Sequence, residues 1–295
     1  MVDALLLELD QRSDYLGTKA IVTIYFGGGS PSILGHDLLQ KIIAHIKANF
    51  IVDPNAEISL EANPDDMTSS SLEGWRKLGV NRLSVGVQSF IDERLIAMNR
   101  AHSSEESFKC ISLAQAAGFD NLSIDLIYGL SGMSEEEWES QLKRALELNI
   151  QHISAYCLTI EPGTVFGKMH ERGELTALDE DAAASQFLTM REATNKAGFD
   201  HYEVSNFGLP GFHSKHNSAY WSGEHYLGLG PSAHSFNGKS RQWSISNNAR
   251  YMKSLEAGEL NFEIEAMSSA NLFNERVMTG LRTRIGLDAT RLQEL

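Results

Sequence analysis

The chain has 295 residues, of which 42% are hydrophobic and 22% charged, and its formal net charge is −14 at pH 7. This acidic balance excludes a protein that holds nucleic acid through phosphate contacts. The sequence has no apolar run near the roughly 18 residues of a membrane span. It also lacks a basic-then-apolar signal at its start, so we expect a cytoplasmic protein.

Strand and helix patterns alternate along residues 1–206. Segments rich in Val, Ile, Leu and Tyr predict strands at 20–26, 57–63, 82–88, 121–130, 152–160 and 200–207. Amphipathic patterns predict helices between them, at 36–50, 68–79, 103–118, 134–149 and 179–198. Ser134 with Glu137 forms a capping-box pattern, and glycines follow three of these helices, at Gly79, Gly118 and Gly198.

The strand ends separate two architectures that this alternation allows, a parallel barrel and an open doubly wound sheet. Each strand ends in polar or glycine residues: Gly27–Ser30, Glu61 with Asn63, Gln88 with Ser89, Asp125, Thr159 with Glu161, and Glu203 with Asn206. In a barrel all these ends meet at one mouth, whereas an open sheet concentrates them at one switch point. We therefore predict an α/β fold with a partial (β/α)6 TIM-like barrel over 1–206.

The remaining segment, 207–295, predicts a loop-rich and helical C-terminal region. Residues 208–238 are rich in Gly, Ser, His and aromatic residues without a helix or strand period. Helical patterns follow at 247–258 and 268–283, and the last residues break off within another helical pattern.

Two cysteines are present, Cys110 in a helical pattern and Cys157 in a strand pattern. We expect both to be buried free thiols in a reducing compartment. The sequence contains no CxxC or CxxxCxxC motif, and therefore no sequence-evident zinc or iron–sulfur site.

The stretch YFGGGSPS, residues 25–32, follows the first predicted strand. It lacks the lysine of a P-loop and the last glycine of a dinucleotide-binding fingerprint. Adjacent glycines expose backbone donors and acceptors, which suits a small zwitterion, although a tight turn before Pro31 would also explain them.

Four ionisable or amide residues lie at or just beyond the same predicted mouth: Glu61, Gln88, Arg100 and Asp125. Such groups are costly inside a barrel unless they bind something. From the residues alone, two alternatives stay open: these groups could be solvated rim residues, or they could form ion pairs with one another.

Eight motifs in order carry a family resemblance: YFGGGSPS, EANPDD, SVGVQSF, NRAHS, SIDLIYGL, LTIEPGTVF, YEVSNF and HNSAYW. Together they resemble the oxygen-independent coproporphyrinogen III oxidase family of radical S-adenosylmethionine (SAM) enzymes, and within it the haem chaperone branch. The resemblance covers essentially the whole chain.

The resemblance implies a ligand set for SAM. Gly28, Gly29 and Ser30, where the family usually has Thr, would bind the methionyl amino group. Further SAM contacts would come from Glu61, Gln88, Arg100, Asp125 and Thr159. A carboxylate suits ribose hydroxyls and an arginine suits the SAM carboxylate.

The resemblance also implies a haem site and partners. HNSAYW matches the haem-binding signature of the chaperone branch, which makes His216 the candidate iron ligand. The implied partners are haem or a porphyrin and a haem-acceptor protein, including a membrane-associated one.

The sequence departs from the family in one respect. The three cluster cysteines, CxxxCxxC, precede the helix in which this chain begins, and the sequence does not contain them. We expect a fragment that lacks this segment and the family's C-terminal end, although a natural cluster-less relative is the alternative. The 4Fe–4S cluster is therefore expected only in the intact family member.

Three functions follow from these observations. The leading one is a haem chaperone of the radical SAM type. The second is anaerobic coproporphyrinogen III oxidation in porphyrin biosynthesis, and the third is a cluster-less tetrapyrrole-binding module. HNSAYW and the missing cluster motif favour the chaperone.

We predict that this polypeptide alone does not cleave SAM, because no three thiolates are present to hold a cluster. The measurement is 5′-deoxyadenosine formation after reconstitution with iron, sulfide and a reductant. Detection of that product would contradict the prediction.

Overall fold

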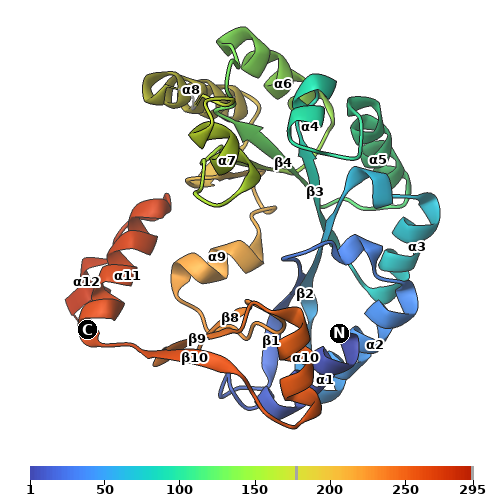
Figure 1. Ribbon diagram of the computed structural model, residues 1–295, viewed down its shortest axis with the longest axis vertical. Helices are drawn as coiled ribbons and strands as arrows, with labels where there is room; N and C mark the ends of the chain where they lie inside the picture. The colour runs from blue at the N-terminus through green and yellow to red at the C-terminus, as the bar shows by residue number, and fades with distance from the viewer. Residues whose placement is uncertain (177–178, 294–295) are drawn as a thin grey trace. The chain divides into compact units, whose positions relative to one another are not determined.

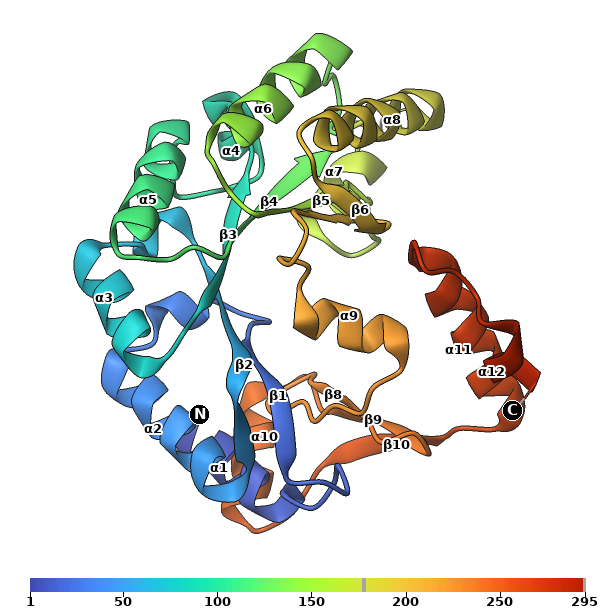
Figure 2. The same ribbon diagram turned by 180° about the vertical axis from the view of Figure 1, so that it is seen from behind.

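The computed structural model describes residues 1–176 and 179–293. The chain divides into two compact units, and each is described by itself (Figures 1 and 2). Unit 1 comprises Met1–Tyr25, Leu34–Ile58 and Ser214–Leu295. Unit 2 comprises Phe26–Ile33 and Ser59–His213. The boundary expected at residue 206 stays a prediction.

Parallel strands form the centre of unit 2. In pairing order they are β2 (Ile51–Ala62, from Ser59 on), β3 (Arg82–Gln88), β4 (Leu122–Tyr128) and β5 (His152–Cys157). Because β2 continues from unit 1, where it neighbours β1 (Ala20–Phe26), the strand order through the sheet is β1-β2-β3-β4-β5-β7-β6. Five of the six predicted strands are therefore confirmed. The bounds of β1 and β3 match the prediction, β4 and β5 are each three residues shorter, and β2 begins six residues earlier.

The helices of unit 2 follow the strands as the amphipathic patterns predict. They are α3 (Ser69–Leu78), α4 (Asp92–Ala97), α5 (Ser104–Ala116), α6 (Glu135–Glu147), α7 (Val165–Glu171) and α8 (Glu180–Lys196), with short 3-10 turns at Pro31–Ile33 and Pro64–Asp66. In both views α3, α5 and α6 lie along one side of β3 and β4. Trp75 of α3, Trp138 of α6 and Ile124 of β4 are fully buried and belong to the core of unit 2.

The start of α6 satisfies only half of the expected capping box. The Ser134 hydroxyl accepts a hydrogen bond from the Glu137 backbone N–H at 3.2 Å. The Glu137 carboxylate instead pairs with Arg94 at 2.8 Å, so an ion pair replaces the return hydrogen bond to the cap.

The prediction of one continuous sixth strand at 200–207 is wrong. Residues 200–207 fold back as a hairpin of β6 (Asp200–Glu203) and β7 (Asn206–Gly208), and β7 pairs antiparallel with β5. Glu203 accepts from the Ser205 backbone N–H at 3.0 Å and from the Asn206 amide, and these local bonds stabilise the reversal.

Unit 1 combines helices with a small sheet. Beside β1 and the first part of β2 its elements are α1 (Val2–Arg12), α2 (His36–Asn49), α9 (Lys215–Ser222), β8 (His234–Phe236), β9 (Ser240–Ser244), α10 (Asn248–Glu256), β10 (Phe262–Ala266), α11 (Ser269–Arg282) and α12 (Ala289–Gln293). The strands β10, β9 and β8 form an antiparallel sheet in that order. The predicted helices at 247–258 and 268–283 are confirmed as α10 and α11.

Helix α9 corrects the expectation that the loop-rich segment 208–238 contains no helix. The Ser214 hydroxyl accepts from the Asn217 N–H at 3.2 Å, and Gly223 ends the helix with a φ of 75°. This serine cap and left-handed glycine are ordinary helix end signals. The helix has no buried residue, so its hydrophobic pattern is weak, and HNSAYW lies on a helix rather than in a loop.

Two further observations complete the fold. Cys110 is buried as expected, but Cys157 is exposed because it ends β5. Within residues 1–176 and 179–293, no helix combines the length and hydropathy that a membrane crossing requires.

Candidate functional site

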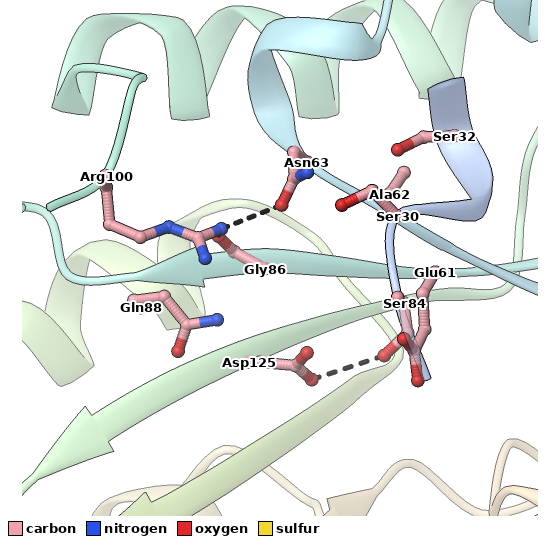
Figure 3. Close-up of a pocket in the computed structure, with 11 residues that line it drawn as sticks. Ser30, Ser32, Glu61, Ala62, Asn63, Ser84, Gly86, Gln88, Arg100 and Asp125 are labelled. Carbon is pink, nitrogen blue, oxygen red and sulfur yellow. Dashed lines mark hydrogen bonds between the residues drawn. The ribbon is translucent and has the colours of Figure 1, made fainter. Parts of the chain in front are cut away.

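A polar cavity of about 150 Å³ lies in unit 2, where β2, β3 and β4 reach their C-terminal ends (Figure 3). It is lined by Gly29, Ser30, Ser32, Glu61, Ala62, Asn63, Ser84, Gly86, Gln88, Arg100 and Asp125. Carboxylates, amides, hydroxyls and one guanidinium thus converge, which is the donor and acceptor set of a site for a small charged ligand.

Arg100 is held at one wall of the cavity (Figure 3). Its Nη2 donates to the Asn63 side-chain oxygen and to the Gly86 carbonyl, both at 2.9 Å. A guanidinium carries five N–H donors, so these bonds leave it capacity to bind a ligand carboxylate. A methyl group on Gly86 would lie 3.0 Å from Nη2 of Arg100 and 3.1 Å from Nε2 of Gln88. Glycine at this position therefore lets both side chains approach the strand.

Gln88 enters the cavity from a β-bulge. The pairing of β3 with β4 shifts between Val85 and Gln88, so β3 holds one extra residue there. Gln88 has a φ of 65°, which is strained for a residue with a side chain. The buried His102 lies behind the bulge, with Nε2 3.1 Å from the Val87 carbonyl. The strain is thus held by surrounding contacts, and it directs an amide toward the ligand space.

Two carboxylates share the opposite wall. Ser84 donates to Asp125 Oδ1 at 3.2 Å, and the Gly28 N–H donates to Glu61 Oε2 at 3.2 Å. Burial, with a further contribution from the neighbouring Glu61 charge, raises the pKa of Asp125 to about 7. At neutral pH Asp125 is therefore only partly ionised, and a cationic ligand would favour its ionisation.

The structure brings most of the predicted SAM residues together. Gly29, Ser30, Glu61, Gln88, Arg100 and Asp125 line the cavity, and Gly28 is tied to Glu61. Thr159 is exposed after β5 and is not among the lining residues. Asn63, Ser84 and Gly86 also line it. The alternation of small residues in SVGVQ was the available sequence signal for Ser84 and Gly86.

The lining residues fit one end of SAM, and the described residues do not fit a cluster. The carboxylates match an ammonium or ribose hydroxyls, and Arg100 matches a carboxylate. A cavity of this volume is below the roughly 300–1,000 Å³ of pockets that enclose whole drug-sized ligands, so it accommodates part of the molecule. Among residues 1–176 and 179–293, no group of three His, Cys, Asp or Glu side chains is arranged to hold a metal.

A second cluster lies in unit 1, around His216. The buried carboxylate of Glu57, on β2, accepts the Lys215 N–H through Oε2 and the His216 N–H through Oε1, each at 3.1 Å. These N–H groups belong to the first turn of α9, which has no intrahelical acceptors for them and favours a negative charge. Glu57 therefore fixes the turn that carries His216.

The His216 ring is half-buried between aromatic and hydroxyl groups. It stacks on Tyr25 with ring centroids 4.4 Å apart and planes 12° apart. Its Nε2 lies 3.1 Å from the Tyr220 hydroxyl, and its Nδ1 lies 3.4 Å from the Thr23 hydroxyl. Burial lowers the pKa of His216 to about 4. The imidazole is therefore neutral at physiological pH, the form that binds haem iron.

The chain resembles known proteins in sequence and in fold. A model of the radical SAM superfamily matches residues 5–145. A solved structure, the coproporphyrinogen III oxidase HemN of Escherichia coli, aligns with a TM-score of 0.84 over 99% of this chain and 70% of that one, at 24% identity. This likeness confirms the partial barrel of the radical SAM type that the sequence predicts.

The sequence match to the radical SAM superfamily, together with the fold, defines a radical SAM-type protein. The chain is 34% identical over 290 residues to the heme chaperone HemW of Mycobacterium tuberculosis, covering 98% of this chain and 74% of that protein. It is 33% identical over 282 residues to the HemW of Bacillus subtilis, with 94% and 74% covered. The chain therefore belongs to the HemW family of the radical SAM superfamily.

We predict a pH-dependent stability effect of Asp125→Asn. The folded-state pKa is raised above the ordinary value of 3.8, so the wild type loses stability as pH rises from about 4 to about 7. Asparagine cannot ionise and still accepts the Ser84 hydrogen bond. Urea unfolding should find the variant more stable than the wild type at pH 8, on the order of 1 kcal/mol, with a smaller difference at pH 5.

The exposed Asp120→Asn variant is the matched control for that measurement. An advantage of Asp125→Asn that is as large at pH 5 as at pH 8 would contradict the assignment.

Proposed function

We propose that this protein is a haem chaperone that binds haem through His216 and SAM in the unit 2 cavity. The observation that carries the haem assignment is the half-buried, neutral imidazole of His216, which stacks on Tyr25 and extends from a backbone whose N–H donates to Glu57. Membership of the HemW family supports the proposal, because its relatives in Mycobacterium tuberculosis and Bacillus subtilis are named heme chaperones. A cytoplasmic location and delivery to an acceptor protein, membrane-associated or not, belong to the same proposal.

Haem would supply an iron centre that a neutral imidazole can bind. The chain's own contribution is to present one imidazole nitrogen in fixed orientation. The stack on Tyr25 restrains rotation of the His216 ring, and the Thr23 hydroxyl lies where it can accept the Nδ1 proton. An acceptor on the second nitrogen fixes the tautomer and raises the basicity of the first.

In the unit 2 cavity the chain's residues would bind and orient the amino-acid and ribose ends of SAM. Glu61 and Asp125 would accept hydrogen bonds from SAM, and Arg100 would bind its carboxylate. The Gln88 amide can both donate and accept hydrogen bonds. Because Asn63 and Gly86 hold Arg100 in advance, little side-chain entropy is lost on binding.

A haem titration tests the haem assignment. We expect a Soret band change with the wild type and at least a tenfold loss of affinity in His216→Ala, because the ligand nitrogen is lost. His234→Ala, which removes an exposed histidine of β8 in the same unit, is the matched control and should bind like the wild type. Unchanged binding by His216→Ala would contradict the assignment, and turnover of coproporphyrinogen would favour the oxidase function.

We predict that Gly86→Ala weakens SAM binding by about tenfold with little loss of stability. The added methyl group lies 3.0 Å from Arg100 Nη2 and must displace the end of this flexible side chain. A misplaced guanidinium loses part of a charge-assisted hydrogen bond, for which 1.4 kcal/mol is a factor of ten. Isothermal titration with SAM measures the change.

Gly35→Ala provides the control, because its added methyl group meets no atom within 4 Å. Equal SAM affinity of Gly86→Ala and the wild type would show that Arg100 is not a ligand-binding group.

A further inference from the structure

Tyr220 contacts the candidate iron ligand directly. It lies four residues after His216 on α9, and its hydroxyl is 3.1 Å from Nε2 of the imidazole. The two rings meet edge to face, with centroids 5.0 Å apart and planes 86° apart. Residues four apart on a helix share one face, so the helix itself keeps the pair together.

The donor and acceptor groups of the two rings give this contact a direction. A phenol hydroxyl can donate to an unprotonated imidazole nitrogen, and 3.1 Å is a hydrogen-bond distance. A neutral imidazole has one N–H donor and one acceptor nitrogen. Thr23 lies near Nδ1 and Tyr220 near Nε2, and each hydroxyl can donate or accept. The phenol is the more acidic of the two hydroxyls and therefore the better donor, which favours the tautomer with the proton on Nδ1. The phenol then donates to the lone pair of Nε2.

We propose that Tyr220 caps the iron-binding nitrogen of His216. Its hydroxyl occupies the Nε2 lone pair in the haem-free protein, gives way when haem iron binds there, and returns when haem leaves. The inference rests on the proposed haem-binding function and adds to it the residue that sets how tightly haem is held.

The cap has a consequence for affinity. Only molecules in which Nε2 of His216 is free of the Tyr220 hydroxyl can bind haem iron. The apparent dissociation constant for haem is therefore the intrinsic constant divided by the fraction of such molecules. A protein that must pass haem on benefits from a hydrogen bond that competes with the iron. Tyr220 keeps 37% of its surface exposed, so it can move without opening the core of unit 1.

The same observations argue against Tyr220 as an iron ligand in its own right. Ligation by tyrosine uses the deprotonated phenolate, and burial opposes loss of that proton here. The nearest further aromatic group, Tyr226, lies edge to face at 4.6 Å and receives the Arg241 guanidinium at 3.1 Å. Tyr226 therefore provides a matched control on the same aromatic cluster.

The test is haem titration and stopped-flow association of Tyr220→Phe, the wild type, Tyr226→Phe and His216→Ala with ferric haem. Loss of one hydrogen bond from the haem-free state should tighten binding about twofold to tenfold in Tyr220→Phe and speed association. The Soret maximum should stay at the wild-type position, because the ligand remains His216. Tyr226→Phe should bind like the wild type.

The outcomes separate the cap from the haem site itself. Unchanged or weaker haem binding by Tyr220→Phe, or a shifted Soret maximum, would overturn the cap while loss of binding in His216→Ala still supports the site. Full binding by His216→Ala would overturn the site.

A long-range nitrogen–proton correlation spectrum of the haem-free protein tests the cap without haem. The Nδ1–H tautomer in the wild type and a shifted Nε2 resonance only in Tyr220→Phe support it, and an Nε2–H tautomer in the wild type overturns it.

Discussion

One buried carboxylate, Glu57, fixes the start of α9, and the geometry of the candidate haem ligand depends on it. A buried carboxylate is costly unless its oxygens are hydrogen-bonded. Here both oxygens accept N–H groups from the first helical turn, one of them from His216 itself. The helix gains a negative charge at its positive end, and the carboxylate gains donors. Because the backbone is fixed at this point, the ring can be stacked on Tyr25 with one orientation.

The unit 2 cavity gathers charged groups of both signs around a space that a ligand can occupy. Asp125 and Glu61 lie close enough for one to raise the pKa of the other, and the bulge at Gln88 holds a strained backbone. Strain and perturbed ionisation persist only where the surrounding structure holds them, and they concentrate at functional sites. Arg100, anchored to Asn63 and Gly86, supplies the positive charge that a zwitterion requires.

Much of this arrangement follows from local sequence patterns. The apolar periods predict the helices and the parallel strands, and the polar strand ends predict which side chains converge. The hairpin of β6 and β7 was missed because side-chain hydrogen bonds of Glu203, rather than Gly or Pro, stabilise its turn. Helix α9 was missed because its few apolar residues do not repeat at the helical period.

Other features depend on contacts between distant parts of the chain. Glu57 lies 159 positions before His216, so no local pattern connects them. Asn63 gains its role only when Arg100, 37 residues later, reaches it. The Tyr220 contact, by contrast, could have been predicted from the four-residue spacing if α9 had been recognised as a helix.

The central claim is that His216 supplies the nitrogen that binds haem iron. Hyperfine spectroscopy of the ferric haem complex, prepared with isotope-labelled histidine, observes that bond directly. The account predicts coupling of the iron to one histidine nitrogen in the wild type and its loss in His216→Ala. The same coupling in both proteins, or no histidine coupling in the wild type, would contradict it.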